Sequence, residues 1–126
     1  QFEGKVDKDT LDMAYKSCDI FVAPSRFESF GLVFLEAMRE GKPVIGCLAG
    51  GIPEVVSNSN GLLVQPDNID ALTEAIITLI KSDNLRTKMG EAGRNIFLEK
   101  FTSKSMAQNS LSIYDMAQKT FEQIKQ

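Results

Sequence analysis

Three short apolar runs, each followed by a helical pattern, constrain the fold of this chain more than any other feature. The runs lie at 20–23, 43–47 and 61–64. Almost every residue within them is apolar, which is typical of strands that are buried on both faces of a parallel sheet. The alternation of strand and helix therefore predicts the α/β class, with a partial parallel sheet flanked by helices.

Helical spacing of apolar residues fills most of the remaining chain. We expect, in order, a short strand at 2–6, a helix capped by Asp9 or Thr10, a helix from Phe30 to Glu40, a short helix at 52–56, and an amphipathic helix capped by Asp67 or Asn68. Beyond residue 83 no strand signal recurs, and two helices are expected, the last capped by Thr102 or Ser103. The chain is thus predicted to form a single domain, 1–126, with an α/β part at 1–82 and a helical part at 83–126.

The composition of the chain excludes several classes of function. Of its 126 residues 43% are hydrophobic, enough for a core, and the net charge of -3 gives no general reason to bind nucleic acid. Histidine is absent, which excludes His-dependent nucleophilic triads and His-ligated zinc, and we expect no metal site. Cys18 and Cys47 are expected to be buried free thiols.

The hydrophobic stretches predict the compartment of the protein, and the start of the chain predicts whether the sequence is part of a longer one. No apolar stretch approaches the roughly 20 residues that a bilayer span needs, and no secretion signal is recognisable, so the cytoplasm is the expected compartment. The chain begins at Gln1 and enters a helical pattern almost at once. We therefore expect it to be a piece of a longer protein.

The loop after the first apolar run, 24–31, carries the strongest functional signal. Glu28 lies in this loop, at the carboxyl end of a strand, where open α/β sheets bind their ligands. Ser29 is expected to cap the next helix, and Gly31 lets a ligand approach the backbone closely. A helix start offers unpaired N–H groups and a partial positive charge, so the loop suits a phosphate. Glu36 follows eight positions after Glu28, about 11 Å along two turns of helix, and the two carboxylates suit sugar or ribose hydroxyls.

Each of these residues also has a purely structural interpretation. Glu36 would then be a solvated side chain that pairs with Arg39 on the helix surface. Glu28 would only offset the helix dipole. Gly50 and Gly51 follow the second apolar run and should emerge at the same edge of the sheet, but they would be ordinary turn residues.

Short motifs follow one another in a fixed order along the chain: Pro24-Ser25, Glu28-Ser29-Phe30-Gly31-Leu32-Val33, Leu35-Glu36-Ala37-Met38, Gly41-Lys42-Pro43-Val44-Ile45, Gly50-Gly51-Ile52-Pro53-Glu54-Val55 and Gly61-Leu62-Leu63-Val64. Together they resemble the retaining glycosyltransferases of family 4, whose E-x7-E element matches Glu28 and Glu36. The resemblance covers nearly the whole chain. It implies the GT-B fold of two Rossmann-like domains and places this chain in the C-terminal, donor-binding domain.

The resemblance implies a role for each matched residue. Glu28 would contact donor-sugar hydroxyls near the reacting centre and is the catalytic candidate, while Glu36 would bind the ribose hydroxyls of the nucleotide. Backbone amides at the helix start would hold the sugar and the pyrophosphate. The predicted donor-binding residues are Glu28, Ser29, Phe30, Gly31, Leu32, Val33 and Glu36, with Gly50 and Gly51 as further candidates.

The same resemblance implies a reaction and its partners. A hexosyltransferase-type enzyme would transfer a sugar from a nucleotide-diphosphate sugar to an acceptor sugar or lipid-linked glycan, with retention of configuration and without a cofactor. The leaving phosphate would take the acceptor proton, and stabilisation of the oxocarbenium-like transition state would be largely electrostatic. The full-length protein would act in polysaccharide biosynthesis. It would lie in the cytoplasm and could associate peripherally with the inner face of the membrane.

Two departures from the family pattern lead to further expectations. The family's Arg and Lys at the pyrophosphate have no counterpart here, because Arg26 and Lys5 fall at other positions, and the acceptor-binding N-terminal domain is missing. We therefore expect the isolated fragment to be inactive and to bind donor weakly. The main alternative is a non-catalytic interaction or regulatory module that keeps the fold. A dinucleotide oxidoreductase and a receiver domain are disfavoured, because neither a G-x-G-x-x-G turn nor clustered strand-end aspartates are present.

Overall fold

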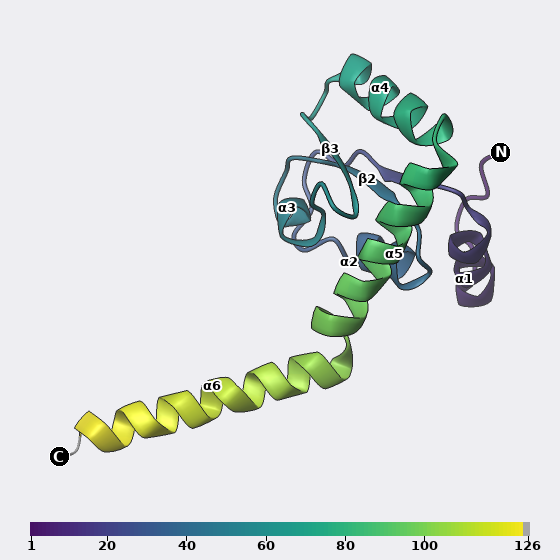
Figure 1. Ribbon diagram of the computed structural model, residues 1–126. Helices are drawn as coiled ribbons and strands as arrows, with labels where there is room; N and C mark the ends of the chain where they lie inside the picture. The colour runs from purple at the N-terminus through teal and green to yellow at the C-terminus, as the bar shows by residue number, and fades with distance from the viewer. Residues whose placement is uncertain (125–126) are drawn as a thin grey trace.

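The computed structural model describes residues 1–124 of the chain, in which strands and helices alternate up to the third strand and only helices follow (Figure 1). The elements are α1 Lys8–Ser17, β1 Phe21–Ala23, α2 Leu32–Arg39, β2 Val44–Cys47, α3 Ile52–Val55, β3 Gly61–Val64, α4 Ile69–Ile80, α5 Asp83–Lys100 and α6 Ser103–Ile124. The predicted α/β class with a helical C-terminal segment is confirmed.

The three strands form one parallel sheet in the order β1-β2-β3. In the middle strand, Val44 pairs in register with Phe21 on one side and with Gly61 on the other. All four residues of β2 are buried, as a run apolar on both faces predicted. The strand expected at 2–6 is not formed. Phe2 is fully exposed and a side chain at Gly4 would meet no atom within 4 Å, so this segment has no neighbouring strand to pair with.

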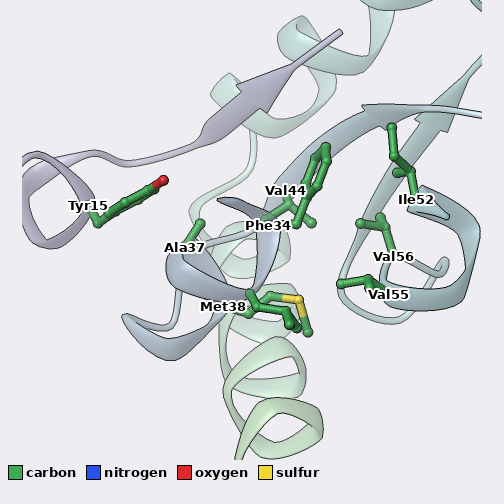
Figure 2. Packing of buried hydrophobic residues seen from close by; sticks show 9 residues of the cluster. Tyr15, Phe34, Ala37, Met38, Val44, Ile52, Val55 and Val56 are labelled. Atoms are coloured by element: carbon green, nitrogen blue, oxygen red, sulfur yellow. The ribbon is translucent and has the colours of Figure 1, made fainter. Parts of the chain in front are cut away.

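Hydrophobic side chains pack on both faces of the sheet. On one face Phe34 and Met38 of α2 are fully buried with Val44, and Ile52 of α3 packs beside them (Figure 2). On the other face α4 covers the sheet through the fully buried Leu79. This two-sided cover is what the apolar runs require, because strands apolar on both faces must be shielded on both.

α5 packs against both cores and joins the helical part of the chain to the sheet. Phe97 packs with the cluster around α2, and Met89 belongs to the cluster under α4. Between them the helix approaches the turn after α2 so closely that a Cβ at Gly90 would lie 2.0 Å from the carbonyl oxygen of Gly41. Only glycine allows two backbones to come so near.

Side-chain caps fix the starts of several helices. Asp7, rather than the expected Asp9 or Thr10, caps α1, because its Oδ1 accepts a hydrogen bond from the Thr10 N–H at 2.8 Å, which lowers the pKa of Asp7. Asn68 caps α4 by accepting at 2.9 Å from a backbone N–H of the first turn. The Thr102 hydroxyl does the same at 3.1 Å for α6. An N-cap side chain reaches only the N–H groups two or three positions further on, so its place before the first turn decides which residue caps the helix.

α6 extends away from the rest of the molecule (Figure 1), and none of its described residues is buried. Several large apolar side chains, among them Leu111 and Tyr114, are exposed along it. Within residues 1–124, no helix combines the length and the hydrophobicity that crossing a membrane requires.

Candidate functional site

The connection between β1 and α2 contains the predicted helix start. α2 begins at Leu32, with Gly31 as its N-cap in a left-handed conformation, φ 91°. Glycine adopts this conformation without strain, and it turns the chain into the helix two residues later than expected. The prediction that Ser29 caps the helix is therefore wrong. Glu36 lies four residues into the helix, about 6 Å of rise from Leu32, so the eight positions from Glu28 to Glu36 are not the two turns of helix expected.

The first turn of α2 leaves backbone N–H groups free. The carbonyl oxygen of Gly31 accepts hydrogen bonds from the N–H groups of Phe34 at 3.0 Å and Leu35 at 3.4 Å. No side chain caps the helix, and in the described part of the chain no acceptor is found for the N–H groups of Leu32 and Val33. With the helix dipole, these two groups make a start that attracts an anion.

The turn after β2 packs directly on the loop that carries Glu28. The Gly51 N–H donates to the carbonyl oxygen of Glu28 at 2.9 Å. A Cβ at Gly50, whose φ is 53°, would lie 2.0 Å from that oxygen, and one at Gly51 would lie 2.5 Å from the carbonyl oxygen of Ser29. The two glycines thus fix the Glu28 loop through direct backbone contact, which is more than an ordinary turn requires.

Glu28 itself is half-buried beside the helix start. Its Cγ lies over Gly31, 3.8 Å from where a Cβ at that position would be. Within residues 1–124, no hydrogen bond or ion pair engages its carboxylate. A carboxylate without a protein partner is free to accept hydrogen bonds from the hydroxyls of a ligand.

Glu36 is held by α1 rather than by its own helix. The Tyr15 hydroxyl donates a hydrogen bond of 2.8 Å to Glu36 Oε2. The pairing of Glu36 with Arg39 that the sequence left open is wrong, because Arg39 instead pairs with Asp12 at 3.1 Å and with Glu40 at 2.9 Å. Glu36 is therefore a partly buried, positioned carboxylate and not a solvated surface charge.

Tyr15 belongs to this site through its bond to Glu36, and no motif in the sequence pointed to it. The residue is 5% exposed, and its ring packs on Phe21 with the ring centroids 5.6 Å apart. Burial, reinforced by the bond to Glu36, raises the pKa of Tyr15 well above its usual value, so the phenol keeps the proton that it donates. The sequence signal was its helical spacing with Leu11 and Ala14, which indicated a packing face and no more.

The side chain of Phe30 packs in part against the helical segment of the chain, although Phe30 remains exposed. Its ring meets Phe101, at the junction of α5 and α6, nearly edge-on with the centroids 6.2 Å apart. No local pattern pointed to Phe101, which lies 71 positions further along the chain.

A hollow of about 180 Å³ lies at the carboxyl ends of all three strands, lined in part by Pro24, Cys47 and Val64. At its rim Arg26 pairs with Asp67 at 2.7 Å, and both side chains are exposed. The sequence analysis did not single out this hollow. Its signal was the position of these residues directly at the strand ends, where α/β sheets place their ligands.

The residues that the structure describes offer no metal centre: no group of three or more Cys, Asp or Glu side chains is placed to hold an ion. Cys18 and Cys47 are both free, as predicted, although Cys18 is only half-buried. Burial raises the pKa of both thiols.

Several solved structures share this fold. Sucrose-phosphate synthase from Thermosynechococcus elongatus superposes with a TM-score of 0.83 and 31% identity, over 95% of this chain and 30% of that one. The C-terminal domain of a glycosyl transferase group 1 family protein (LpcC) from Francisella tularensis gives 0.74 and 31%, over 81% of this chain and 53% of that one. HepE from Anabaena in complex with UDP-glucose superposes with a TM-score of 0.74 and 28% identity, over 82% of this chain and 29% of that one. The fold is that of the C-terminal domain of GT-B glycosyltransferases.

The family described as Glycosyl transferases group 1 matches residues 1–96, and the chain belongs to this family. An uncharacterized glycosyltransferase of Methanocaldococcus jannaschii is 33% identical over 117 residues, which is 92% of this chain and 30% of that protein. N-acetyl-alpha-D-glucosaminyl L-malate synthase of Bacillus anthracis is 38% identical over 114 residues, 90% of this chain and 29% of that protein. The chain thus spans about 30% of the length of these relatives.

Proposed function

We propose that this chain is the donor-binding portion of a retaining family 4 glycosyltransferase that transfers a hexose from a nucleotide-diphosphate sugar. One observation carries the proposal: the unpaired N–H groups of Leu32 and Val33 lie at a helix start beside the unpartnered carboxylate of Glu28. Such a place suits a phosphate next to a hydroxyl-rich group. The solved structures of HepE with UDP and with UDP-glucose, which share the fold, support the same ligand class.

The chemistry proposed for each group follows from its position. The helix start binds the diphosphate, Glu28 accepts hydrogen bonds from sugar hydroxyls, and Glu36 accepts them from the ribose. Gly50 and Gly51 hold the Glu28 loop, so the carboxylate need not reorganise during the reaction. As the bond to the sugar breaks, negative charge grows on the diphosphate, and groups already aimed at it lower the barrier. The leaving phosphate takes the proton of the attacking acceptor hydroxyl.

The remaining functions are assigned to parts of the protein outside residues 1–126. An N-terminal domain would bind the acceptor, a sugar or lipid-linked glycan, and an upstream Arg and Lys would complete the diphosphate site. The full-length protein would act in the cytoplasm, at the inner face of the membrane where the acceptor is lipid-linked, and would need no cofactor. The isolated chain would not turn over donor.

The test uses the full-length protein with a panel of UDP- and GDP-hexoses and measures release of the nucleoside diphosphate. Glu28→Ala is expected to lower kcat by about a hundredfold or more, the size found when one positioned group at a reacting centre is lost. Glu74→Ala, at an exposed position on α4, is the matched control and should leave kcat unchanged. The anomeric coupling constant in the product, measured by proton NMR, reports retention or inversion.

The outcomes separate the enzyme from its main alternative, a non-catalytic module that keeps the fold. Unchanged turnover in Glu28→Ala would remove Glu28 from the mechanism. Nucleotide-sugar binding without any transfer or donor hydrolysis by the unaltered protein would favour the regulatory module. An inverted product would contradict the assignment to a retaining family.

A further inference from the structure

We propose that Tyr15 is a positioning residue that orients Glu36 toward the ribose of the nucleotide donor. The inference rests on the proposed function, which assigns the ribose hydroxyls to Glu36. It starts from a contact between two helices: Tyr15 on α1 and Glu36 on α2 are 21 positions apart in the chain, and 2.8 Å separates the phenol oxygen from Glu36 Oε2. α1 thereby reaches into a site whose other groups come from the β1–α2 connection and the turn after β2.

The phenol is held rigidly where it meets the carboxylate. The Tyr15 ring extends from α1 toward α2 (Figure 2), and it packs on Phe21 of β1. Phe21 in turn meets Phe34 of α2 edge-on, with the centroids 5.5 Å apart. Three rings thus connect α1, β1 and α2, and the buried Tyr15 has little freedom to change rotamer. The donor hydrogen is therefore presented at one fixed point.

A second contact keeps α1 in place beside α2. Arg39, one turn further along α2 than Glu36, donates to Asp12 of α1 at 3.1 Å. Asp12 and Tyr15 lie three positions apart and so share one face of α1. The two contacts set the position of α1 along α2, which places the phenol opposite Glu36 and not opposite a neighbouring residue.

This geometry matters for a ligand that carries two neighbouring hydroxyls. A free glutamate rotates about three side-chain bonds, and ordering it on binding costs conformational entropy. Here Oε2 is already bound to Tyr15, so the carboxylate plane is set before the ligand arrives, and within residues 1–124 no other partner competes for Oε1. An ordinary tyrosine already keeps its proton at physiological pH, and the raised pKa of Tyr15 widens that margin, so the phenol remains a donor.

The test is Tyr15→Phe in the full-length protein, which keeps the ring and removes the hydroxyl. Binding of UDP, GDP and their 2′,3′-dideoxy analogues is measured by calorimetry, and the readout is the affinity ratio of the ribose form to the dideoxy form. We expect the ratio to fall about three- to tenfold, the worth of one hydrogen bond, with the dideoxy affinity unchanged. The matched control is Tyr114→Phe on α6, where the ring is 72% exposed, and it should alter neither affinity.

Other results of this binding experiment would contradict the role of Tyr15, the role of Glu36 or the proposed function. Equal weakening of both forms would make Tyr15 merely structural and overturn the proposal. An unaltered ratio in Tyr15→Phe, with a clear ribose preference in the unaltered protein, would overturn it while leaving the proposed function intact. Absence of a ribose preference in the unaltered protein would remove the role of Glu36, and absence of any nucleotide binding would refute the proposed function itself.

Discussion

The approach of α5 to the turn after α2 predicts a large loss of stability from a very small substitution, Gly90→Ala. The added Cβ would lie 2.0 Å from the carbonyl oxygen of Gly41 and 2.9 Å from its carbon. Carbon and oxygen tolerate a contact of about 3.3 Å, so the two backbones must separate by about 1 Å. A contact this short with a backbone atom lies at the upper end of overpacking costs, about 3 kcal/mol, and the better helix propensity of alanine returns only about 1 kcal/mol. We expect a net loss of about 2 kcal/mol.

Gly93→Ala is the matched control on the same helix. Its Cβ would lie 3.2 Å from Cγ of Met38, a flexible side chain that can shift, so gain and strain should cancel to within about 0.5 kcal/mol. Calorimetric unfolding of the full-length protein measures both variants. Gly90→Ala should lower the unfolding temperature of this domain by about 4–8 °C, and Gly93→Ala should leave it nearly unchanged. Equal stability of the two variants would refute the reasoning from the close approach.

The loop contact, the proposed upstream cations and the buried phenol each predict a separate outcome. Gly50→Ala would place a Cβ 2.0 Å from the carbonyl oxygen of Glu28, so the loop must move. Donor affinity measured by calorimetry should then fall more than about tenfold. Unchanged affinity would show that this loop does not contribute to donor binding. Residues 1–126 alone should bind UDP-glucose about a hundredfold more weakly than the full-length protein, and equal affinity would show that the upstream cations are not needed. Tyr15 has a raised pKa when folded, so the unfolded chain releases this proton first and the free energy of unfolding should fall as pH rises above about 10. In urea titrations Tyr15→Phe should show a weaker fall, whereas parallel slopes would contradict the burial argument.

The strands could be predicted from sequence because each is apolar on both faces. Such a run has one main structural explanation, and the observed strands lie within the predicted ranges 20–23, 43–47 and 61–64. The strand expected at 2–6 shows the limit of this reasoning. Apolar residues there satisfy the local pattern, but a strand exists only when a neighbour supplies hydrogen bonds. Phe2 has no neighbouring strand in the structure, and a local sequence pattern does not show whether a neighbouring strand is present.

A helix start at the candidate site could be predicted from the sequence, but the residue that caps it could not. A β–α connection at the carboxyl edge follows from topology, and it placed Glu28 beside a helix start. Ser29 is by local preference the better N-cap, yet Gly31 holds that place because the chain needs a positive φ there to enter α2. The contact between Tyr15 and Glu36 was beyond local reasoning, since it depends on how α1 lies against α2.

If the proposed function holds, the charges at the carboxyl edge predict that donor binding needs cations from elsewhere in the protein. A diphosphate would bring about two negative charges to a helix start that already lies beside the carboxylate of Glu28. Two like charges about 6 Å apart repel by roughly 3 kcal/mol at an effective dielectric constant of 20, while the start of α2 offers only about half a positive charge. Arg26, on the same loop, is paired with Asp67 at 2.7 Å. On the proposed function, Glu28 and Glu36 would select a ligand rich in hydroxyls, its phosphates would need further cations, and those same cations would stabilise the diphosphate as it leaves.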